Sequence, residues 1–265
     1  MVKQKEMYDD DKAFEKTFDC EFLSEYLRQA QWAEMVELKK AIFELHFSMG
    51  KPISLLDVGI GNARFPKHLS GIREIWDLIG HYDGIDNVQG CVDLSNRVVS
   101  EMGLEDKVDV ALLDAVNLDA LGKKYGMIIF TWFTAGNFYP MDFPFDSYQT
   151  DTQERYDLSR NEKFERIFRN SYDMLESGGE IVIGFVYVDN DSTRKKQEDF
   201  YTKCGMTVTT DERDTFTATK ERFWSQRFTE GRVRDYLGFV PKGSISFTNL
   251  DTYNFAMMIR VGKYF

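Results

Sequence analysis

The sequence predicts an α/β fold, with a mostly parallel sheet and helices on both of its faces. A short apolar strand runs directly into a glycine-rich turn, at Gly59 and Gly61, that opens a helix. Two further short strands, at 81–86 and 107–114, each end in an aspartate. The segment Tyr125–Phe130 is mostly apolar, as expected for a parallel strand buried on both faces.

The glycine turn indicates a ligand with an adenosine-type structure. Glycines at 59 and 61 allow a tight turn and a close approach of backbone amides to a ligand. A dinucleotide fingerprint would continue with a third glycine facing a pyrophosphate, but Ala63 and Arg64 follow instead. The carboxylate of Asp57, before the glycines, can accept hydrogen bonds from loop amides and face an ammonium group, whereas it would repel a pyrophosphate. The alternative is an ordinary strand-to-helix turn.

The spacing Asp57-x-Gly59-x-Gly61 resembles the first motif of class I S-adenosylmethionine-dependent methyltransferases, with Ala63 where many members have a third glycine. The resemblance implies a Rossmann-like sheet of seven mostly parallel strands. It also implies S-adenosyl-L-methionine as methyl donor and S-adenosyl-L-homocysteine as product. The cofactor-binding residues that we expect are Asp57, Gly59, Gly61, Asn62, Arg64, Asp86, Asn87, Asp114, Ala115 and Thr131.

Two acids at strand ends have separate expected roles. Asp86 ends the second strand, where a carboxylate accepts two hydrogen bonds from ribose hydroxyls in nucleoside-binding α/β folds. Asp83 is interpreted as a solvated residue at the start of that strand. The resemblance places Asp114, at the end of the third strand, near the adenine amine; the alternative is a simple loop carboxylate.

The chemistry should lie where the carboxyl ends of the parallel strands converge, at 131–140. Methyl transfer from a sulfonium is an in-line displacement that needs alignment and exclusion of water more than side-chain chemistry. Aromatic faces attract a sulfonium or an ammonium group through cation–π contacts. We therefore expect Asn137, Tyr139 and Trp132 as catalytic residues and, as substrate-binding residues, Phe133, Phe138, Tyr187, Arg222 and Trp224.

Several of these residues have plainer alternatives. Phe133 and Phe138 are equally compatible with packing under the loop, and Arg222 and Trp224 with exposed strand positions. The string Thr-Ala-Gly-Asn-Phe-Tyr-Pro also resembles the Gly-Asn-Phe loop of amino-acid N-methyltransferases that trimethylate histidine. That local resemblance would place Asn137 at a substrate amino group.

The expected organisation is one decorated domain. Residues 1–50 read as a helical extension that lids the cofactor, with Tyr8, Tyr26 and Trp32 as lid candidates or simple packing residues. Residues 51–265 form the methyltransferase domain, and 206–228 an antiparallel hairpin over the active site with one polar face. Helices are expected at 161–175, 191–204 and 229–238, and a Gly-Gly turn before a buried strand at 180–186.

Composition limits the partners. The formal net charge of −11 argues against a nucleic-acid substrate, because phosphate backbones require clustered Lys and Arg. The basic run 194–196 is interpreted as a solvated helix face. Three cysteines without metal or disulfide spacing indicate a reducing compartment, and no apolar run is long enough to span a bilayer. We expect a cytoplasmic protein with no metal, no membrane association and a small-molecule substrate; a homodimer is left open.

Histidine bases are scarce, since His46, His68 and His81 all fall away from the strand exits. Proton removal is therefore assigned to Tyr139, Asp142, Tyr187 or water. Two other functions stay open at this point. One is an NAD(P)-dependent oxidoreductase that uses the same glycine turn, and the other is a non-catalytic protein that binds an adenosyl ligand.

Overall fold

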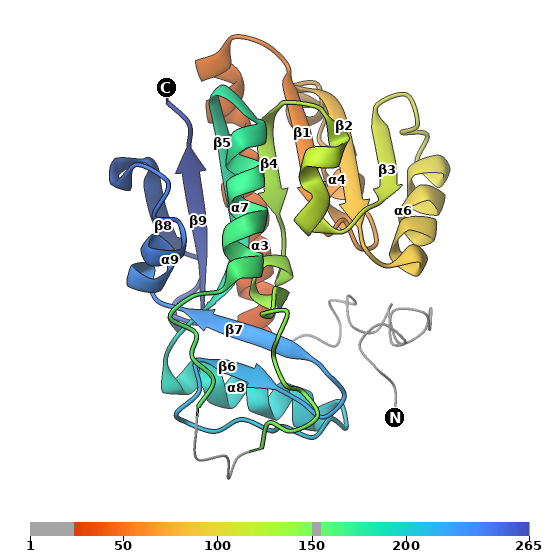
Figure 1. Cartoon of the computed structure of the whole chain (residues 1–265). Helices are drawn as coiled ribbons and strands as arrows, with labels where there is room; N and C mark the ends of the chain where they lie inside the picture. Colours follow the sequence, from red (N-terminus) through yellow and green to blue (C-terminus); the bar gives the residue numbers. More distant parts are fainter. Residues whose placement is uncertain (1–23, 150–154, 265) are drawn as a thin grey trace.

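The computed structural model describes residues 24–149 and 155–264, and shows a central sheet flanked by helices (Figure 1). Its strand order is β3-β2-β1-β4-β5, with β9 antiparallel to β5 and β8 antiparallel to β9. The first five strands are mutually parallel. The predicted seven-stranded, mostly parallel sheet is confirmed. Its strands are β1 (Ile53–Val58), β2 (Ile79–Asp86), β3 (Val108–Leu112), β4 (Tyr125–Phe130), β5 (Leu175–Val188), β8 (Ile245–Asn249) and β9 (Ala256–Gly262).

Helices cover both faces of this sheet (Figure 1), and α7, α8 and α9 each begin at a polar side chain that caps the helix. Asn161, Asn190 and Thr229 each accept a hydrogen bond from a backbone amide of the helix that follows, the usual N-cap arrangement. The helical segments are α3 (Glu25–Met49), α4 (Arg64–Ser70), α5 (Arg73–Trp76), α6 (Gln89–Glu101), η2 (Ala115–Leu121), η3 (Thr134–Asn137), α7 (Glu162–Met174), α8 (Asp191–Lys203), α9 (Glu230–Tyr236) and η4 (Lys242–Ser244). None of the helices in the described ranges is both long and apolar enough to cross a membrane.

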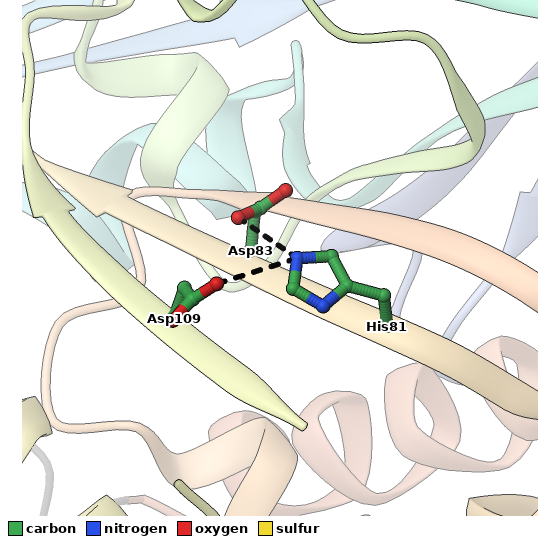
Figure 2. Close-up of side chains that lie close together, drawn as sticks. All are labelled: His81, Asp83 and Asp109. Atoms are coloured by element: carbon green, nitrogen blue, oxygen red, sulfur yellow. Dashed lines mark ion pairs between the residues drawn. The ribbon is translucent and has the colours of Figure 1, made fainter. Parts of the chain in front are cut away.

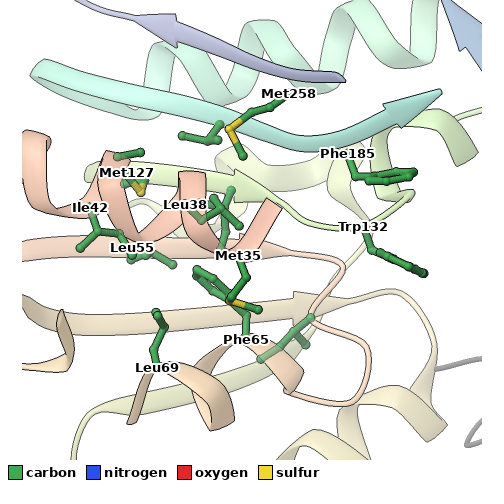
Figure 3. Packing of buried hydrophobic residues seen from close by; sticks show 14 of the residues in the cluster. Met35, Leu38, Ile42, Leu55, Phe65, Leu69, Met127, Trp132, Phe185 and Met258 are labelled. Carbon is green, nitrogen blue, oxygen red and sulfur yellow. The ribbon is translucent and has the colours of Figure 1, made fainter. Parts of the chain in front are cut away.

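Two hydrophobic clusters hold these layers together. On one face, Leu38 and Ile42 of α3 pack with Leu55 and Met127 of the central strands (Figure 3). On the other face, Phe168 of α7 belongs to a second cluster of buried apolar residues from β1, β4, β5 and β9. α3 ends at Gly50, whose φ of +65° is the left-handed conformation that glycine adopts without strain. α3, the described helix of the predicted extension, therefore packs onto the sheet as part of the core.

β5 differs from its predicted form at the start. The expected Gly-Gly turn lies inside the strand, since Tyr125 pairs with Leu175 while Met127 already pairs with Glu180. The extra residues form a bulge, in which Gly178 takes a φ of +80°. A Cβ on Gly179 would lie 2.8 Å from the carbonyl oxygen of Gly126, so this close strand approach requires glycine.

The added hairpin consists of β6 (Phe216–Ala218) and β7 (Trp224–Phe228). β7 pairs with the end of β5, which joins the hairpin to the central sheet. Two details correct the prediction. Residues 206–215 contribute only an isolated bridge from Val208, and the polar side chains of the hairpin, including Arg227 at 1% exposure, are buried rather than exposed. The burial arises because α8 packs against the hairpin.

Asp83 is also placed differently from the prediction, because it is only 6% exposed. Its carboxylate accepts hydrogen bonds from Lys123 Nζ at 2.9 and 3.0 Å and from the Tyr125 hydroxyl at 2.8 Å. His81 Nε2 lies 3.2 Å from Asp83 and 3.6 Å from Asp109 (Figure 2). Burial alone would raise the pKa of Asp83, but the hydrogen bonds from Lys123 and Tyr125 outweigh it and lower this pKa.

This lowered pKa predicts an acid-sensitive contribution to stability. A carboxyl group whose pKa is lower in the folded state stabilises the protein above its unfolded pKa, and that stability is lost as the pH falls below about 4. The substitution Asp83→Asn should therefore lower the unfolding free energy by about 1–3 kcal/mol at neutral pH. Urea denaturation of both proteins should show a difference that is constant above about pH 5 and shrinks as the pH falls from about 5 to 3. A difference that stays constant over this range would contradict the assignment.

Candidate functional site

A cavity of about 490 Å³ opens where the carboxyl ends of the parallel strands meet. This volume is in the usual range for a small-molecule site. The lining includes nearly all of the residues predicted from the sequence. The predicted cofactor residues that line it are Gly59, Gly61, Asn62, Arg64, Asp86, Asn87, Asp114, Ala115 and Thr131, and the predicted catalytic and substrate residues are Trp132, Phe133, Asn137, Phe138, Tyr139, Tyr187 and Arg222.

The glycine loop is fixed to the end of β2. The amides of Gly59 and Ile60 both donate to the carbonyl oxygen of Ile85, at 2.8 and 3.0 Å. Ala63 has a φ of +54°, so alanine occupies the left-handed conformation at the position of the missing third glycine. A Cβ on Gly59 would lie 2.7 Å from the Thr134 side chain, and glycine is therefore required there.

Asp86 connects this loop to the cavity. Its Oδ2 accepts from the Gly61 amide at 3.1 Å and its Oδ1 from the Val88 amide at 3.0 Å. Burial raises its pKa, although these amide hydrogen bonds act in the opposite direction. Asp114 accepts from the Val116 amide at 3.1 Å and caps η2. Both acids therefore hold loop backbone and line the cavity as well.

Asp57 does not make the predicted hydrogen bonds with the amides of the glycine loop. Its Oδ2 accepts from the Tyr82 hydroxyl at 2.6 Å, while Oδ1 has no hydrogen-bond partner among the described residues. It accepts nothing from the loop amides, because those of Gly59 and Ile60 are used by the Ile85 carbonyl. Burial raises the pKa of Asp57 to about 7, against the opposing hydrogen bond from Tyr82. The carboxylate lies behind the loop and outside the cavity lining.

Glu34 on α3 is a residue of this region that the sequence reasoning missed. It is fully buried, and its Oε1 accepts from the Trp132 amide at 2.6 Å. Its Oε2 lies 3.3 Å from Arg64 Nη2, and the Arg64 guanidinium lies 5.2 Å from the centre of the Trp132 ring. Trp132 itself has a φ of +55°, which is uncommon for a bulky residue. Burial raises the pKa of Glu34, and Arg64 opposes that shift.

Glu34 also explains a glycine on the adjacent strand. A Cβ on Gly184 of β5 would collide with Glu34 Oε1. The sequence did contain a signal for Glu34. Ala30, Glu34 and Leu38 are spaced four residues apart, so on a helix Glu34 lies on the same face as two apolar residues. Glu34 therefore connects α3 to the exit of β4, through the Trp132 amide, and to α4, through Arg64.

The aromatic residues of the β4 exit divide between packing and the cavity. Phe133 stacks on Tyr187, with ring centres 4.4 Å apart and an angle of 13° between the planes. Phe138 packs against Phe130 and Phe168 while it also lines the cavity. Tyr139 lies under Lys163 Nζ, at 4.9 Å from the ring centre. These aromatic rings form an apolar part of the cavity wall.

Asn137 takes part in a small hydroxyl network. Its Oδ1 accepts a long hydrogen bond, at 3.5 Å, from Ser225 Oγ, which in turn contacts the Tyr201 hydroxyl. Burial raises the pKa of Tyr201 to about 12, and burial raises that of Tyr187 well above its ordinary value. These phenols are therefore neutral at physiological pH. None of the three histidines, all within the described residues, lines the cavity.

The two predicted hairpin residues differ in placement. Arg222 lines the cavity at the hairpin turn with a φ of +68°, and its Nη2 lies 2.6 Å from Asp146. Trp224 is 1% exposed and stacks on Phe216 at 4.1 Å, so it belongs to a buried aromatic cluster outside the cavity lining. An exposed strand position, the alternative considered for Trp224, is wrong.

Other lining residues come from segments that the sequence reasoning did not connect with the site. Of the lid candidates, Tyr26 lines the cavity, Trp32 is 67% exposed, and Tyr8 lies outside the described residues. Within the basic run, Lys196 faces the cavity while Lys195 is exposed, so the run is not wholly a solvated face. The further lining residues include Lys163, Gln197, Phe200, Tyr201, Cys204, Met206, Phe223, Ser225 and Phe255.

No family model and no curated protein matches the sequence. Solved structures do match the fold. An S-adenosylmethionine-dependent methyltransferase from Clostridium acetobutylicum has a TM-score of 0.57 at 11% identity, over 96% of this chain and 98% of that one. An O-methyltransferase family protein from Burkholderia thailandensis has a TM-score of 0.53 at 11% identity; the match covers 99% of this chain but only 63% of that protein.

A third structure, magnesium protoporphyrin IX methyltransferase from Synechocystis with bound S-adenosyl-L-homocysteine, has a TM-score of 0.50 at 10% identity. The match covers 91% of this chain and 89% of that one. At such identities these matches concern the fold. The chain therefore has the fold of the class I S-adenosylmethionine-dependent methyltransferases.

Proposed function

We propose that this protein transfers a methyl group from S-adenosyl-L-methionine to a nitrogen or oxygen atom of a small-molecule acceptor, such as an amino acid or an amine. The observation that carries the proposal is the cavity itself. It runs from two acids at the ends of β2 and β3 to an aromatic loop at the exit of β4, in a methyltransferase fold. Ligands of open α/β sheets bind in this position.

The residues of the first half of the chain fit an adenosyl ligand. The Asp86 carboxylate has lone pairs beyond its two amide contacts and would accept from the ribose hydroxyls. Asp114 would lie at the adenine amine, and Gly59 and Gly61 leave room for the backbone to approach the ligand. The missing third glycine and the confined cavity give no comparable support to a nicotinamide dinucleotide.

The chain's own residues would mainly align the reactants and exclude water. The donor supplies a methyl carbon on a sulfonium: a nitrogen or oxygen lone pair forms the new bond, and the carbon–sulfur bond breaks with its electron pair staying on sulfur. Asn137 can position the acceptor, and the aromatic wall of Trp132, Phe133 and Tyr139 attracts positive charge. Because the lining phenols Tyr187 and Tyr201 are neutral, the acceptor's proton would pass to water.

The direct test is calorimetric titration with S-adenosyl-L-methionine, S-adenosyl-L-homocysteine and NADH in parallel. We expect micromolar binding of the two adenosyl ligands and no binding of NADH. Binding of NADH alone would replace the proposal with a redox enzyme. A protein that binds S-adenosyl-L-methionine but transfers no methyl group to any amine, amino acid or phenol would instead be a non-catalytic binding protein.

Asn137→Ala should separate acceptor binding from cofactor binding. Asn137 contacts the acceptor side through Ser225 and Tyr201 and makes no contact with the glycine loop. We expect methyl transfer to fall by about 10-fold or more, while S-adenosyl-L-homocysteine affinity stays within about 2-fold. The measurements are a radiolabelled methyl-transfer assay and calorimetry. Equal loss of cofactor affinity would move Asn137 into the donor pocket.

A further inference from the structure

The charged residues of the cavity are distributed unevenly. The lining acids, Asp86 and Asp114, both lie at the ends of β2 and β3, on the side assigned to adenosine. From residue 115 onward, the charged residues of the lining are Lys163, Lys196 and Arg222, all of them cations. Arg222 is paired with Asp146 at 2.6 Å, so in a chain of net charge −11 it is Lys163 and Lys196 that give the acceptor side a local positive character.

Lys196 is a cation without an ion pair to any residue that the structure describes. Its Nζ lies over the rings of Tyr26, Tyr253 and Phe255, at 4.9, 5.2 and 5.3 Å from their centres. On the same helix, Arg194 is neutralised by Glu198 at 3.0 Å. The aromatic faces already hold one cation, and a substrate ammonium group would be repelled from this position.

Gln197, the next residue of α8, is 2% exposed and lines the cavity. Two donors fix the orientation of the Gln197 amide group. Arg227 Nη1, which can only donate, lies 2.8 Å from Gln197 Oε1, and Thr217 Oγ1 donates to the same oxygen at 3.0 Å. Nε2 therefore faces away from Arg227. The amide group interacts with the Tyr187 hydroxyl and opposes the rise that burial causes in the pKa of Tyr187. Nε2 nevertheless makes no hydrogen bond of regular geometry with a described residue.

A buried amide donor without an acceptor costs free energy, and a ligand acceptor would remove that cost. Lys196 and Gln197 come together on one aromatic group: Phe255 lies 4.8 Å from Tyr26 and 5.1 Å from Tyr187, between ring centres. One ammonium group and one amide donor match the single charge and two oxygens of a carboxylate. The aromatic surface beside them suits a flat or apolar body.

We propose that the methyl acceptor is a carboxylic acid with an aromatic or apolar body, whose carboxylate is bound by Lys196 Nζ and Gln197 Nε2. The inference rests on the proposed function and specifies its substrate class. The carboxylate serves for recognition, and the methyl group goes to another nitrogen or oxygen of the same molecule. That atom's lone pair forms the new bond to carbon, sulfur keeps the electrons of the broken bond, and the displaced proton goes to water.

The test uses the full chain saturated with S-adenosyl-L-homocysteine. The probes are anthranilate, 4-hydroxybenzoate and phenylalanine, each measured by calorimetry beside its own carboxamide. We expect at least one acid to bind about 10-fold or more tightly than its carboxamide. Equal affinity for acid and carboxamide, or dissociation constants above about 1 mM for all three acids, would overturn the inference.

Two variants assign the effect to the two residues. Lys196→Met keeps the aliphatic contact with the rings and removes the charge, and Lys195→Met on the exposed face is its matched control. Gln197→Glu keeps an oxygen for Arg227 and replaces the Nε2 donor with a second acceptor. For Lys196→Met and Gln197→Glu we expect the acid affinity to fall by about 10-fold or more, with carboxamide affinity unchanged.

The results of these binding measurements distinguish a failure of this inference from a failure of the proposed function. If the wild-type protein does not bind S-adenosyl-L-homocysteine at all, the proposed function fails. If it binds that ligand, and Lys196→Met weakens it while sparing the acids, then Lys196 binds the cofactor's own carboxylate. In that case the substrate inference fails and the proposed function stands.

Discussion

Replacing Glu34 by alanine should lower the free energy of unfolding by about 3 kcal/mol, a large effect for one polar residue. The substitution leaves the Trp132 amide without its acceptor at 2.6 Å and removes the charge that faces Arg64 at 3.3 Å. A buried donor that loses its partner pays the full desolvation cost. Urea denaturation monitored by circular dichroism measures the change.

The matched control is Glu37→Ala on the same helix. Glu37 pairs with the exposed Lys40 at 3.7 Å, and surface pairs of this kind contribute at most about 1 kcal/mol. Glu34→Gln retains an oxygen for the Trp132 amide and should lie between the wild-type protein and the alanine variant. If Glu34→Ala and Glu37→Ala cost the same, Glu34 does not hold the extension to the β4 exit.

The strand framework was predictable because its signals are local. A parallel strand buried on both faces is continuously apolar, and a polar residue at its end marks the point where it leaves the core. β4 follows the rule of continuous burial, and Asp86 and Asp114, at the exits of β2 and β3, both line the cavity. The order of such segments along the chain limits the sheet to few topologies. The fold and one half of the site therefore follow from the sequence.

The acceptor side was less predictable because its residues depend on how distant elements pack. Lys196 and Gln197 lie in a helix with a polar sequence that predicts solvent exposure. The hairpin covers Gln197, and the rings of Tyr26, Tyr253 and Phe255 cover Lys196. Arg227 illustrates the cause: the sequence predicts a strand with one polar face at this position, yet Arg227 is buried and contacts Gln197 and Asp189. No spacing rule predicts that contact.

Asp57 shows a different limit of prediction from the sequence. The motif correctly predicts a tight turn, since Gly59 and Gly61 both have positive φ values. It does not predict which partner the carboxylate takes, because Tyr82, 25 residues further along, reaches Asp57 from the neighbouring strand. A motif of this kind fixes the backbone more strongly than it fixes the contacts of its side chains.

Asp86→Ala should cause the largest loss of cofactor binding. Two interactions disappear at once: the proposed hydrogen bonds to the ribose hydroxyls, and the amide contacts at 3.0 and 3.1 Å that hold the glycine loop. Together these should weaken binding of S-adenosyl-L-homocysteine by about 3 kcal/mol, or roughly 100-fold. Calorimetry measures the affinity, and urea denaturation shows whether the variant remains folded.

Asp93→Ala, an exposed aspartate on the helix that follows, controls for the loss of one negative charge. Asp86→Asn separates the two roles of the carboxylate. Its one remaining side-chain oxygen can accept from either the Gly61 or the Val88 amide, while its NH₂ group opposes the other. The asparagine variant keeps one of the two amide contacts, so its unfolding free energy should lie closer to that of the wild-type protein than the alanine variant's does, while it binds the ligand more weakly. A folded alanine variant with unchanged affinity would remove Asp86 from the ribose site, and with it the main reason for placing adenosine at the end of β2.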